Sequence, residues 1–233
     1  MKLGILNADA VKPEFAAKFG EYPDMFAELF RQVDPEIDLT TYEVVRGEYP
    51  ADIDEVDAYV ITGSKLSVYD DVPWIIDLKD FVKQLHASKK KTIGICFGHQ
   101  LVAESLDGKT GPAESGWCVG IHNTTFTDAA ESYGLATSEF KIPSNHKDQV
   151  LQLPTGGKLL ASTESCPISA MGVDDHILTF QGHPEFSKGY ARALLDMRRE
   201  IFGEDQYHEA INSLENETDS SEVASWILDF ISR

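Results

Sequence analysis

The chain has 233 residues, 42% hydrophobic and 25% charged, a balance typical of a globular protein with one sizeable core. Acidic residues outnumber basic ones by 39 to 20, and the formal net charge of −19 argues against nucleic acids and anionic membranes as partners. No segment has the length and apolar character of a membrane span, and the three cysteines show no paired spacing, so we expect a reducing, cytoplasmic setting.

The first half of the chain alternates between expected strands and expected helices. Short apolar runs predict strands at residues 2–8, 38–45, 57–63 and 91–96. Apolar residues at helical spacing predict helices at residues 26–33, 73–90 and 99–106. This alternation favours an α/β fold in which helices cover both faces of a mostly parallel sheet.

The second half of the chain has a different pattern. From Gly111 to about Phe180, short apolar runs are separated by Gly, Pro and Asn, which predicts β-rich additions to the main sheet. Helices are expected at residues 187–202 and 221–233, with Asp219 as the cap of the second, and the acidic stretch between them is weakly patterned. Because we find no internal repeat and no linker, we expect residues 1–233 to form a single domain.

The stretch GICFG at residues 94–98 places a cysteine between an expected strand and an expected helix. Such a turn is typical of a nucleophile elbow, in which Gly94 and Gly98 allow the tight backbone and Cys96 is presented above the sheet edge. The positive end of the helix favours the thiolate, and the amide of Phe97 would face an oxyanion. The alternative interpretation makes Cys96 a small buried residue at the end of a strand.

The HPE segment at residues 183–185 is the second element of a possible catalytic site. A residue before proline is pushed toward extended geometry, and residues two apart in an extended chain point to the same side. Glu185 can therefore fix one tautomer of His183 while His183 takes the proton of Cys96. Alone, HPE could be a surface turn; together with the glycine-flanked cysteine it predicts a nucleophile, a base and an orienting carboxylate.

These motifs resemble those of a known family. GICFGHQ and QGHPEF are similar to the nucleophile and base motifs of class I glutamine amidotransferases, and CFGHQ, SNHKDQVLQLP and GHPEF look most like the stand-alone members, GMP-synthase-like amidotransferases and γ-glutamyl peptidases. The resemblance implies a flavodoxin-like α/β core and a thioester mechanism. It also makes Cys96 the nucleophile, His183 the base and Glu185 its orienting group.

The resemblance implies further roles around the nucleophile. The oxyanion hole would use the backbone N–H groups of Phe97 and Ser64, and Ser64 follows Gly63 where many relatives have two adjacent glycines. This difference leaves open whether the loop is preformed or must flip into place.

Substrate contacts are also implied by the resemblance. They fall on Gly63, Gln100, Asn145 and His146. Gln100 matches the glutamine that holds the α-amino-acid end of the substrate, and its alternative is a polar residue at a helix N-terminus. Asn145 and His146 match the segment whose backbone binds the substrate carboxylate, although either side chain could cap a turn.

The sequence leaves three functions open. The first is hydrolysis of the γ-glutamyl amide bond of glutamine or a γ-glutamyl compound, a small-molecule substrate. The second is a glutaminase subunit that passes ammonia to a separate synthetase, since this chain has no nucleotide-binding motif of its own. The third is a non-catalytic binding module of the same fold. No metal or other cofactor is expected, and His99, Cys118 and Cys166 are interpreted as structural residues.

Overall fold

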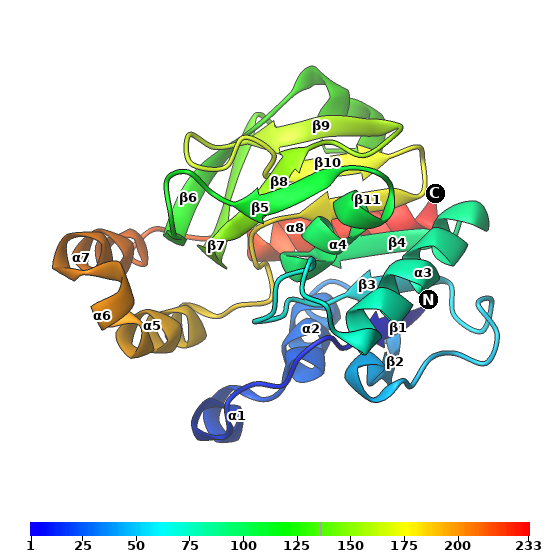
Figure 1. Ribbon diagram of the computed structural model, residues 1–233, viewed down its shortest axis with the longest axis horizontal. Coiled ribbons are helices and arrows are strands. Elements are labelled where there is room, and N and C mark those ends of the chain that lie inside the picture. Colours follow the sequence, from blue (N-terminus) through cyan, green and yellow to red (C-terminus); the bar gives the residue numbers. More distant parts are fainter. Residues whose placement is uncertain (136) are drawn as a thin grey trace.

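The computed structural model describes residues 1–135 and 137–233, which form one large sheet with helices around it (Figure 1). The strands are β1 (Lys2–Leu6), β2 (Asp38–Tyr42), β3 (Ala58–Ile61), β4 (Lys91–Ile95), β5 (Lys109–Pro112), β6 (Cys118–Phe126), β7 (Glu139–His146), β8 (Asp148–Gln152), β9 (Gly157–Ser162), β10 (Ala170–Val173) and β11 (Ile177–Phe180). The α-helices are α1 (Pro13–Phe19), α2 (Tyr22–Arg31), α3 (Pro73–Ala87), α4 (Phe97–Ser105), α5 (Lys188–Met197), α6 (Arg199–Phe202), α7 (Glu204–Ser213) and α8 (Ser220–Ser232). Two 3-10 helices are η1 (Val44–Arg46) and η2 (Asp128–Tyr133).

The main sheet has nine strands in the order β2-β1-β3-β4-β11-β10-β9-β6-β7. The five strands from β2 to β11 run parallel to one another, whereas β10, β9, β6 and β7 pair in antiparallel fashion. A separate antiparallel ribbon joins β5 to β8. The predicted parallel α/β sheet with β-rich additions is therefore confirmed.

Helices cover both faces of the parallel strands (Figure 1). On one face, α3 and α4 contribute apolar residues such as Leu78 and Leu101 to a cluster with Tyr59 and Ile61 of β3. On the other face, α2 and α8 contribute Phe26 and Ile227 to a second apolar cluster. Strands covered on both sides need apolar residues in every position, which explains why β3 is buried throughout.

The weakly patterned acidic stretch contains the helix α7, which the sequence analysis did not predict. Its buried residues Tyr207 and Ala210, with Leu214 directly after the helix, pack against Val119 and Ile121 of β6. The apolar stripe of α7 is narrow, and polar residues, several of them acidic, face the solvent around it. The helix thus depends on tertiary packing rather than on a strong sequence signal.

Asp219 begins α8 as predicted, but its carboxylate does not cap the helix. Its Oδ2 accepts a hydrogen bond of 2.7 Å from the amide of Lys141 in β7 instead. The residue therefore joins the start of α8 to the edge of the sheet.

Four adjacent parallel strands, β1, β3, β4 and β11, end at the same edge of the sheet. The segments that follow them carry Asp9, Gly63, Cys96 and His183. Ligands of open α/β sheets bind in the crevice outside such carboxyl ends. Within the described residues, every helix falls short of the length and apolar character that crossing a membrane requires.

Candidate active site

Cys96 occupies a sharp turn between β4 and α4. Its backbone has φ 52° and ψ −100°, a conformation that is costly for a residue other than glycine. Two backbone hydrogen bonds hold the turn, from the Cys96 amide to the Phe180 carbonyl at 2.9 Å and from the Gln100 amide to the Cys96 carbonyl at 3.0 Å. The sulfur therefore stands at the N-terminus of α4, where the helix dipole favours a negative charge.

The two glycines of the elbow are required by close backbone approach. A methyl group added at Gly94 would lie 2.6 Å from the Gly98 carbonyl oxygen, and one added at Gly98 would lie 2.5 Å from the Ile61 carbonyl oxygen. Neither backbone oxygen can move without shifting a strand or a helix. Both positions are thus restricted to glycine by the contact of α4 with β3 and β4.

The HPE segment forms a buried pair beside Cys96. The Nδ1 atom of His183 lies 2.8 Å from Oε1 of Glu185, and both side chains are buried. The imidazole stacks on the ring of Phe186, with 3.9 Å between ring centroids and 10° between the planes. Because Nδ1 is engaged by Glu185, Nε2 is left for the proton of the nucleophile.

The charges around His183 favour its protonated form. Burial alone would lower the pKa of His183, but the negative charges of Cys96 and Glu185, with hydrogen bonds to both, raise it to about 10. A protonated imidazole next to the sulfur favours the negative charge that a cysteine nucleophile carries when it attacks.

Gly63 and Ser64 follow β3 beside the elbow. A methyl group at Gly63 would lie 3.0 Å from Cε1 of His183 and 3.8 Å from Cβ of Cys96, so the backbone of this loop touches the nucleophile and the base. Within residues 1–135 and 137–233, the amides of Ser64 and Phe97 donate no hydrogen bond. Both predicted oxyanion donors are therefore free to bind a substrate oxygen.

Hydrogen bonds hold the loop that carries Ser64 on both of its sides. Asp9, in the segment after β1, accepts hydrogen bonds from the amide of Lys65 at 2.9 Å and from its Nζ at 2.6 Å. On the other side, the carboxylate of Asp148 accepts hydrogen bonds from the hydroxyls of Ser67 and Tyr69. These contacts hold the loop on both sides of Ser64.

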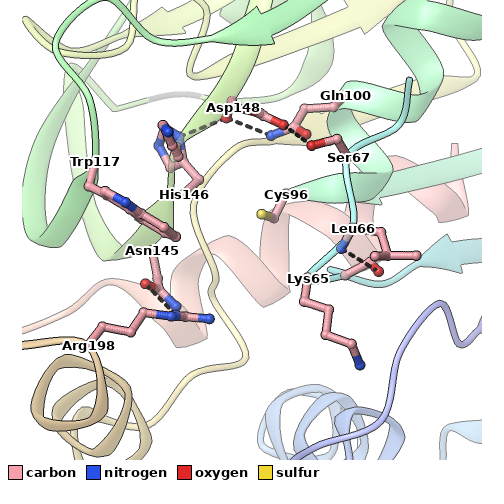
Figure 2. A pocket seen from close by; sticks show the side chains of 12 residues that line it. Lys65, Leu66, Ser67, Cys96, Gln100, Trp117, Asn145, His146, Asp148 and Arg198 are labelled. Carbon is pink, nitrogen blue, oxygen red and sulfur yellow. Dashed lines mark hydrogen bonds between the residues drawn. The ribbon is translucent and has the colours of Figure 1, made fainter. Parts of the chain in front are cut away.

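A cavity of about 200 Å³ opens next to Cys96 (Figure 2). Among the residues expected at the site, the cavity is lined by Cys96, Ser64, Gln100, Asn145 and His146. The thiol of Cys96 points into this space. The remaining expected residues surround Cys96 without lining the cavity.

Gln100 is oriented by two hydrogen bonds from its amide nitrogen. Nε2 donates to the carbonyl oxygen of Asp148 at 2.7 Å and to Oε1 of Gln181 at 3.1 Å. Both protons of the amide are thereby used, and its Oε1 remains as an acceptor. This orientation suits the binding of an ammonium group.

Asn145 and His146 end β7 on the opposite wall of the cavity (Figure 2). Oδ1 of Asn145 accepts a hydrogen bond of 3.0 Å from Arg198, and Nδ1 of His146 lies 3.0 Å from the carbonyl oxygen of Asp148. Both side chains are thus held within the protein, which leaves backbone groups of this segment as the substrate contacts that the resemblance implies.

Several residues of the site were not found by sequence analysis. Arg198 reaches the cavity from the break between α5 and α6, where a single long helix was expected, and it lies 5.3 Å from the ring of Trp117. Lys65 and Lys147 add two further cations to the wall. No spacing rule connects these residues, because they come from separate elements. The sequence analysis also did not predict that Phe186 stacks on His183. The position of Phe186 directly after the HPE segment could have indicated this contact.

His99 is a structural residue, as expected from its position. Its Nδ1 lies 2.7 Å from the hydroxyl of Thr179, its Nε2 lies 3.1 Å from the carbonyl oxygen of Ile168, and burial lowers its pKa to about 3. A neutral imidazole with both nitrogens engaged cannot act as the base of the site.

Of the two other cysteines, Cys118 has a polar setting that the sequence analysis did not predict. Burial opposes ionisation of Cys118, but hydrogen bonds from His122 and His146, together with their charges, lower its pKa to about 5. The register of β6 against β7 places Cys118 opposite His146, so the pairing of the two strands explains this setting. Burial raises the pKa of Cys166 to about 12, as suits a packing residue.

Substitution of Gly63 by alanine tests how closely the loop positions the base. The new methyl group would lie 3.0 Å from Cε1 of His183, whose ring cannot retreat freely because it stacks on Phe186. We expect kcat to fall by about 10- to 100-fold, as small misplacements of catalytic groups do. Steady-state kinetics of Gly63→Ala measures this loss.

Gly111→Ala is the matched control for this substitution. Its methyl group would also come within 3.0 Å of a neighbour, but that neighbour is the end of the exposed, flexible side chain of Leu151. We expect its kcat to be unchanged. Equal rates for Gly63→Ala and the unmodified protein would show that the loop does not constrain His183.

Comparison with known proteins agrees with this geometry. The family model for class I glutamine amidotransferases matches residues 29–197. A glutamine amidotransferase-like protein of Schizosaccharomyces pombe is 33% identical over 243 residues, covering 98% of this chain and 98% of its own length. Gamma-glutamyl peptidase 3 of Arabidopsis thaliana is 33% identical over 192 residues, covering 78% of this chain and 76% of its own length.

The fold is also similar to that of a solved structure. The crystal structure of a glutamine amido transferase from Methylobacillus flagellatus is 18% identical in sequence and matches with a TM-score of 0.77 over 98% of this chain and 94% of that chain. This match confirms the flavodoxin-like fold. The chain belongs to the class I glutamine amidotransferase family.

Proposed function

We propose that this chain hydrolyses the γ-glutamyl amide bond of a small substrate through a thioester on Cys96. The observation that carries the proposal is the buried His183–Glu185 pair beside a cysteine held in a left-handed turn at a helix N-terminus. A binding module would have no need for this costly backbone or for a buried ion pair. We therefore place the non-catalytic alternative last.

The proposed reaction has two halves. In the first, Sγ of Cys96 attacks the γ-carbonyl carbon, the oxyanion is bound by the amides of Ser64 and Phe97, and Nε2–H of His183 protonates the leaving nitrogen as the C–N bond breaks. In the second, His183 takes a proton from water, the hydroxide attacks the thioester carbon, and the sulfur leaves as a thiolate. Glu185 stabilises the imidazolium in both halves.

The glutamyl end of the substrate would lie against Gln100 and the end of β7. Oε1 of Gln100 accepts a hydrogen bond from the α-ammonium group, because its Nε2 is held by Asp148 and Gln181. The α-carboxylate meets the backbone of Asn145 and His146. Gly63 contributes by letting the loop approach closely enough to place Ser64.

The cations on the cavity wall favour a substrate with two carboxylates. In a chain of net charge −19, Lys65, Lys147 and Arg198 all line this cavity. Lys65 pairs with Asp9, whereas Arg198 and Lys147 have no carboxylate partner in the part of the chain that the structure describes. One of them is sufficient for the α-carboxylate of the glutamyl end. The other is suited to the carboxylate of a leaving amino acid, so we propose γ-glutamyl peptides rather than glutamine as substrates.

A comparison of leaving groups tests this assignment. We expect kcat/KM for γ-glutamyl dipeptides to exceed that for glutamine and for the same dipeptides with an amidated C-terminus. Arg198→Met should lower kcat/KM for the dipeptides by about 10- to 100-fold, the usual cost of losing a charge-assisted hydrogen bond, and should affect the amidated compounds much less.

Arg199→Met provides the matched control, because this neighbouring arginine is bound to Glu204 at the surface. Its kinetics should equal those of the unmodified protein. An equal loss on dipeptides and amidated dipeptides in Arg198→Met would assign Arg198 to the α-carboxylate and contradict its proposed role. A preference for glutamine over every dipeptide would instead favour a glutaminase subunit that supplies a separate synthetase.

A further inference from the structure

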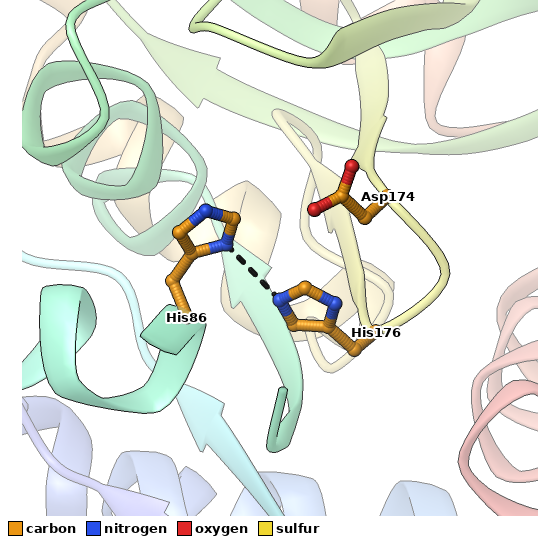
Figure 3. A group of neighbouring side chains, drawn as sticks. All are labelled: His86, Asp174 and His176. Carbon is orange, nitrogen blue, oxygen red and sulfur yellow. Dashed lines mark hydrogen bonds between the residues drawn. The ribbon is translucent and has the colours of Figure 1, made fainter. Parts of the chain in front are cut away.

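A group of side chains that could bind a metal consists of His86, Asp174 and His176 (Figure 3). His86 belongs to the last turn of α3, and Asp174 and His176 belong to the turn between β10 and β11. The amide of Thr92, at the start of β4, donates to the carbonyl oxygen of His176 at 2.8 Å, which fixes this turn against the beginning of that strand. The group is therefore separated from the catalytic cavity by the length of β4.

The ligand atoms of the three side chains are close together. One nitrogen or oxygen from each of His86, Asp174 and His176 lies within 4.8 Å of the other two. Nδ1 of His86 and Nε2 of His176 are 3.0 Å apart. Bond lengths of 2.0–2.1 Å place two nitrogens on a tetrahedral zinc ion about 3.3 Å apart, so the histidines need to separate by only a few tenths of an ångström.

A carboxylate lies beside the ring nitrogen of His176 that faces away from His86. Nδ1 of His176 lies 3.4 Å from Oδ1 of Asp175, and its Nε2 is directed at Nδ1 of His86. Histidine ligands usually donate their second N–H to a carboxylate in this way.

Asp174 is positioned by its backbone rather than by its carboxylate. The residue has φ 49°, and its carbonyl oxygen accepts a hydrogen bond from the hydroxyl of Tyr133. Its exposed carboxylate accepts no hydrogen bond from any described residue, and it can rotate toward the histidines. Among the nearby cations, Lys91 lies over the ring of Phe230 and donates to the carbonyl oxygen of Asp175 at 2.9 Å, and Lys158 lies over the ring of Tyr133.

We propose that His86, Asp174 and His176 bind a divalent transition-metal ion of the zinc class. Two imidazole nitrogens and one carboxylate oxygen are a donor set that zinc accepts, with water as the fourth ligand, whereas magnesium and calcium prefer oxygen donors. The ion would join the end of α3 to the β10–β11 turn. Its role is structural, because the site lies at the other end of β4 from the nucleophile.

Metal binding is best measured in a background without the catalytic thiol. Cys96→Ser removes the thiolate that could bind metal together with His183, and the purified protein is first treated with a chelator. We expect equilibrium dialysis to show one zinc ion per chain. Zinc at about 100 times its Kd should raise the Tm by roughly 5–10 °C, while magnesium and calcium should not. Cobalt(II) should give the visible spectrum of a nitrogen and oxygen site without thiolate charge transfer.

Variants of the ligands assign the site. In the same background, His86→Gln and Asp174→Asn should each weaken zinc binding by at least about 10-fold and reduce the Tm shift. We expect these two substitutions to disturb folding less than a substitution of His176, because His176 is buried. His208→Gln, at an exposed histidine of α7, is the matched control and should bind zinc normally. Zinc binding that survives both ligand substitutions, a cobalt spectrum with thiolate charge transfer, or no binding at millimolar zinc would overturn the proposal.

Discussion

Replacement of Cys96 by serine is expected to lower kcat/KM on γ-glutamyl substrates by at least about 10⁴-fold while the protein stays folded. The hydrogen bonds that hold the elbow use the backbone of Cys96 and leave its side chain free, so they survive the substitution. A serine hydroxyl is close in size to a thiol but remains protonated at neutral pH. The pair of His183 and Glu185 would then have to remove that hydroxyl proton, and the resulting nucleophile is weaker than one derived from a thiol.

The result depends on the position of the cysteine and not on thiol chemistry in general. Cys166→Ser is therefore the matched control, since Cys166 is also buried and reduced but lies outside the cavity. Circular dichroism and thermal unfolding show whether each variant is folded, and steady-state kinetics measures the loss. A Cys96→Ser protein with most of its activity would end the thioester mechanism, and an inactive unmodified protein would restore the binding-module alternative.

The meeting of Cys96, His183 and Glu185 at one place could be predicted from sequence because its information is local. The elbow needs Gly94 and Gly98 at fixed distances from Cys96, and His183 and Glu185 are brought together by two residues of extended chain. Parallel strands then bring both motifs to one edge, since β4 and β11 are neighbours in the sheet. The spacing within each motif is thus set by nearby residues, and only the order of the parallel strands is needed to bring the two motifs together.

No local sequence pattern predicts the cations that line the cavity or the contact between His86 and His176. Arg198 enters the cavity because a helix expected to be continuous breaks there, and Lys147 arrives from the end of β7. His86 and His176 are 90 residues apart and match no metal-binding spacing, so only the packing of α3 on the sheet joins them. The hydrogen bond that Asp9 accepts from the amide of Lys65, next to Ser64, is likewise a contact between residues far apart in the sequence.

Substitution of Glu185 by glutamine is expected to lower kcat by about 10²- to 10⁴-fold with little change in KM. Glutamine has the same shape, and its oxygen can still accept the proton of His183 Nδ1. The other carboxylate oxygen, Oε2, has no hydrogen-bond partner among the described residues, so the amide nitrogen that replaces it breaks no contact. The substitution removes the negative charge that stabilises the imidazolium. If the glutamine amide turns so that its nitrogen donates to Nδ1, His183 also loses the tautomer that the reaction requires.

The pH profile separates this electrostatic role from a structural one. The charges of Cys96 and Glu185 overcome the effect of burial and raise the pKa of His183, so the imidazolium that protonates the leaving group persists far into the alkaline range. Removal of the Glu185 charge should lower that pKa and move the alkaline limb of kcat/KM to lower pH. Glu217→Gln, at an exposed carboxylate paired only loosely with Lys188, is the control and should leave the whole profile unchanged. A Glu185→Gln protein with a reduced rate but an unshifted alkaline limb would mean that Glu185 supports the fold of the HPE segment and does not act on the charge of His183.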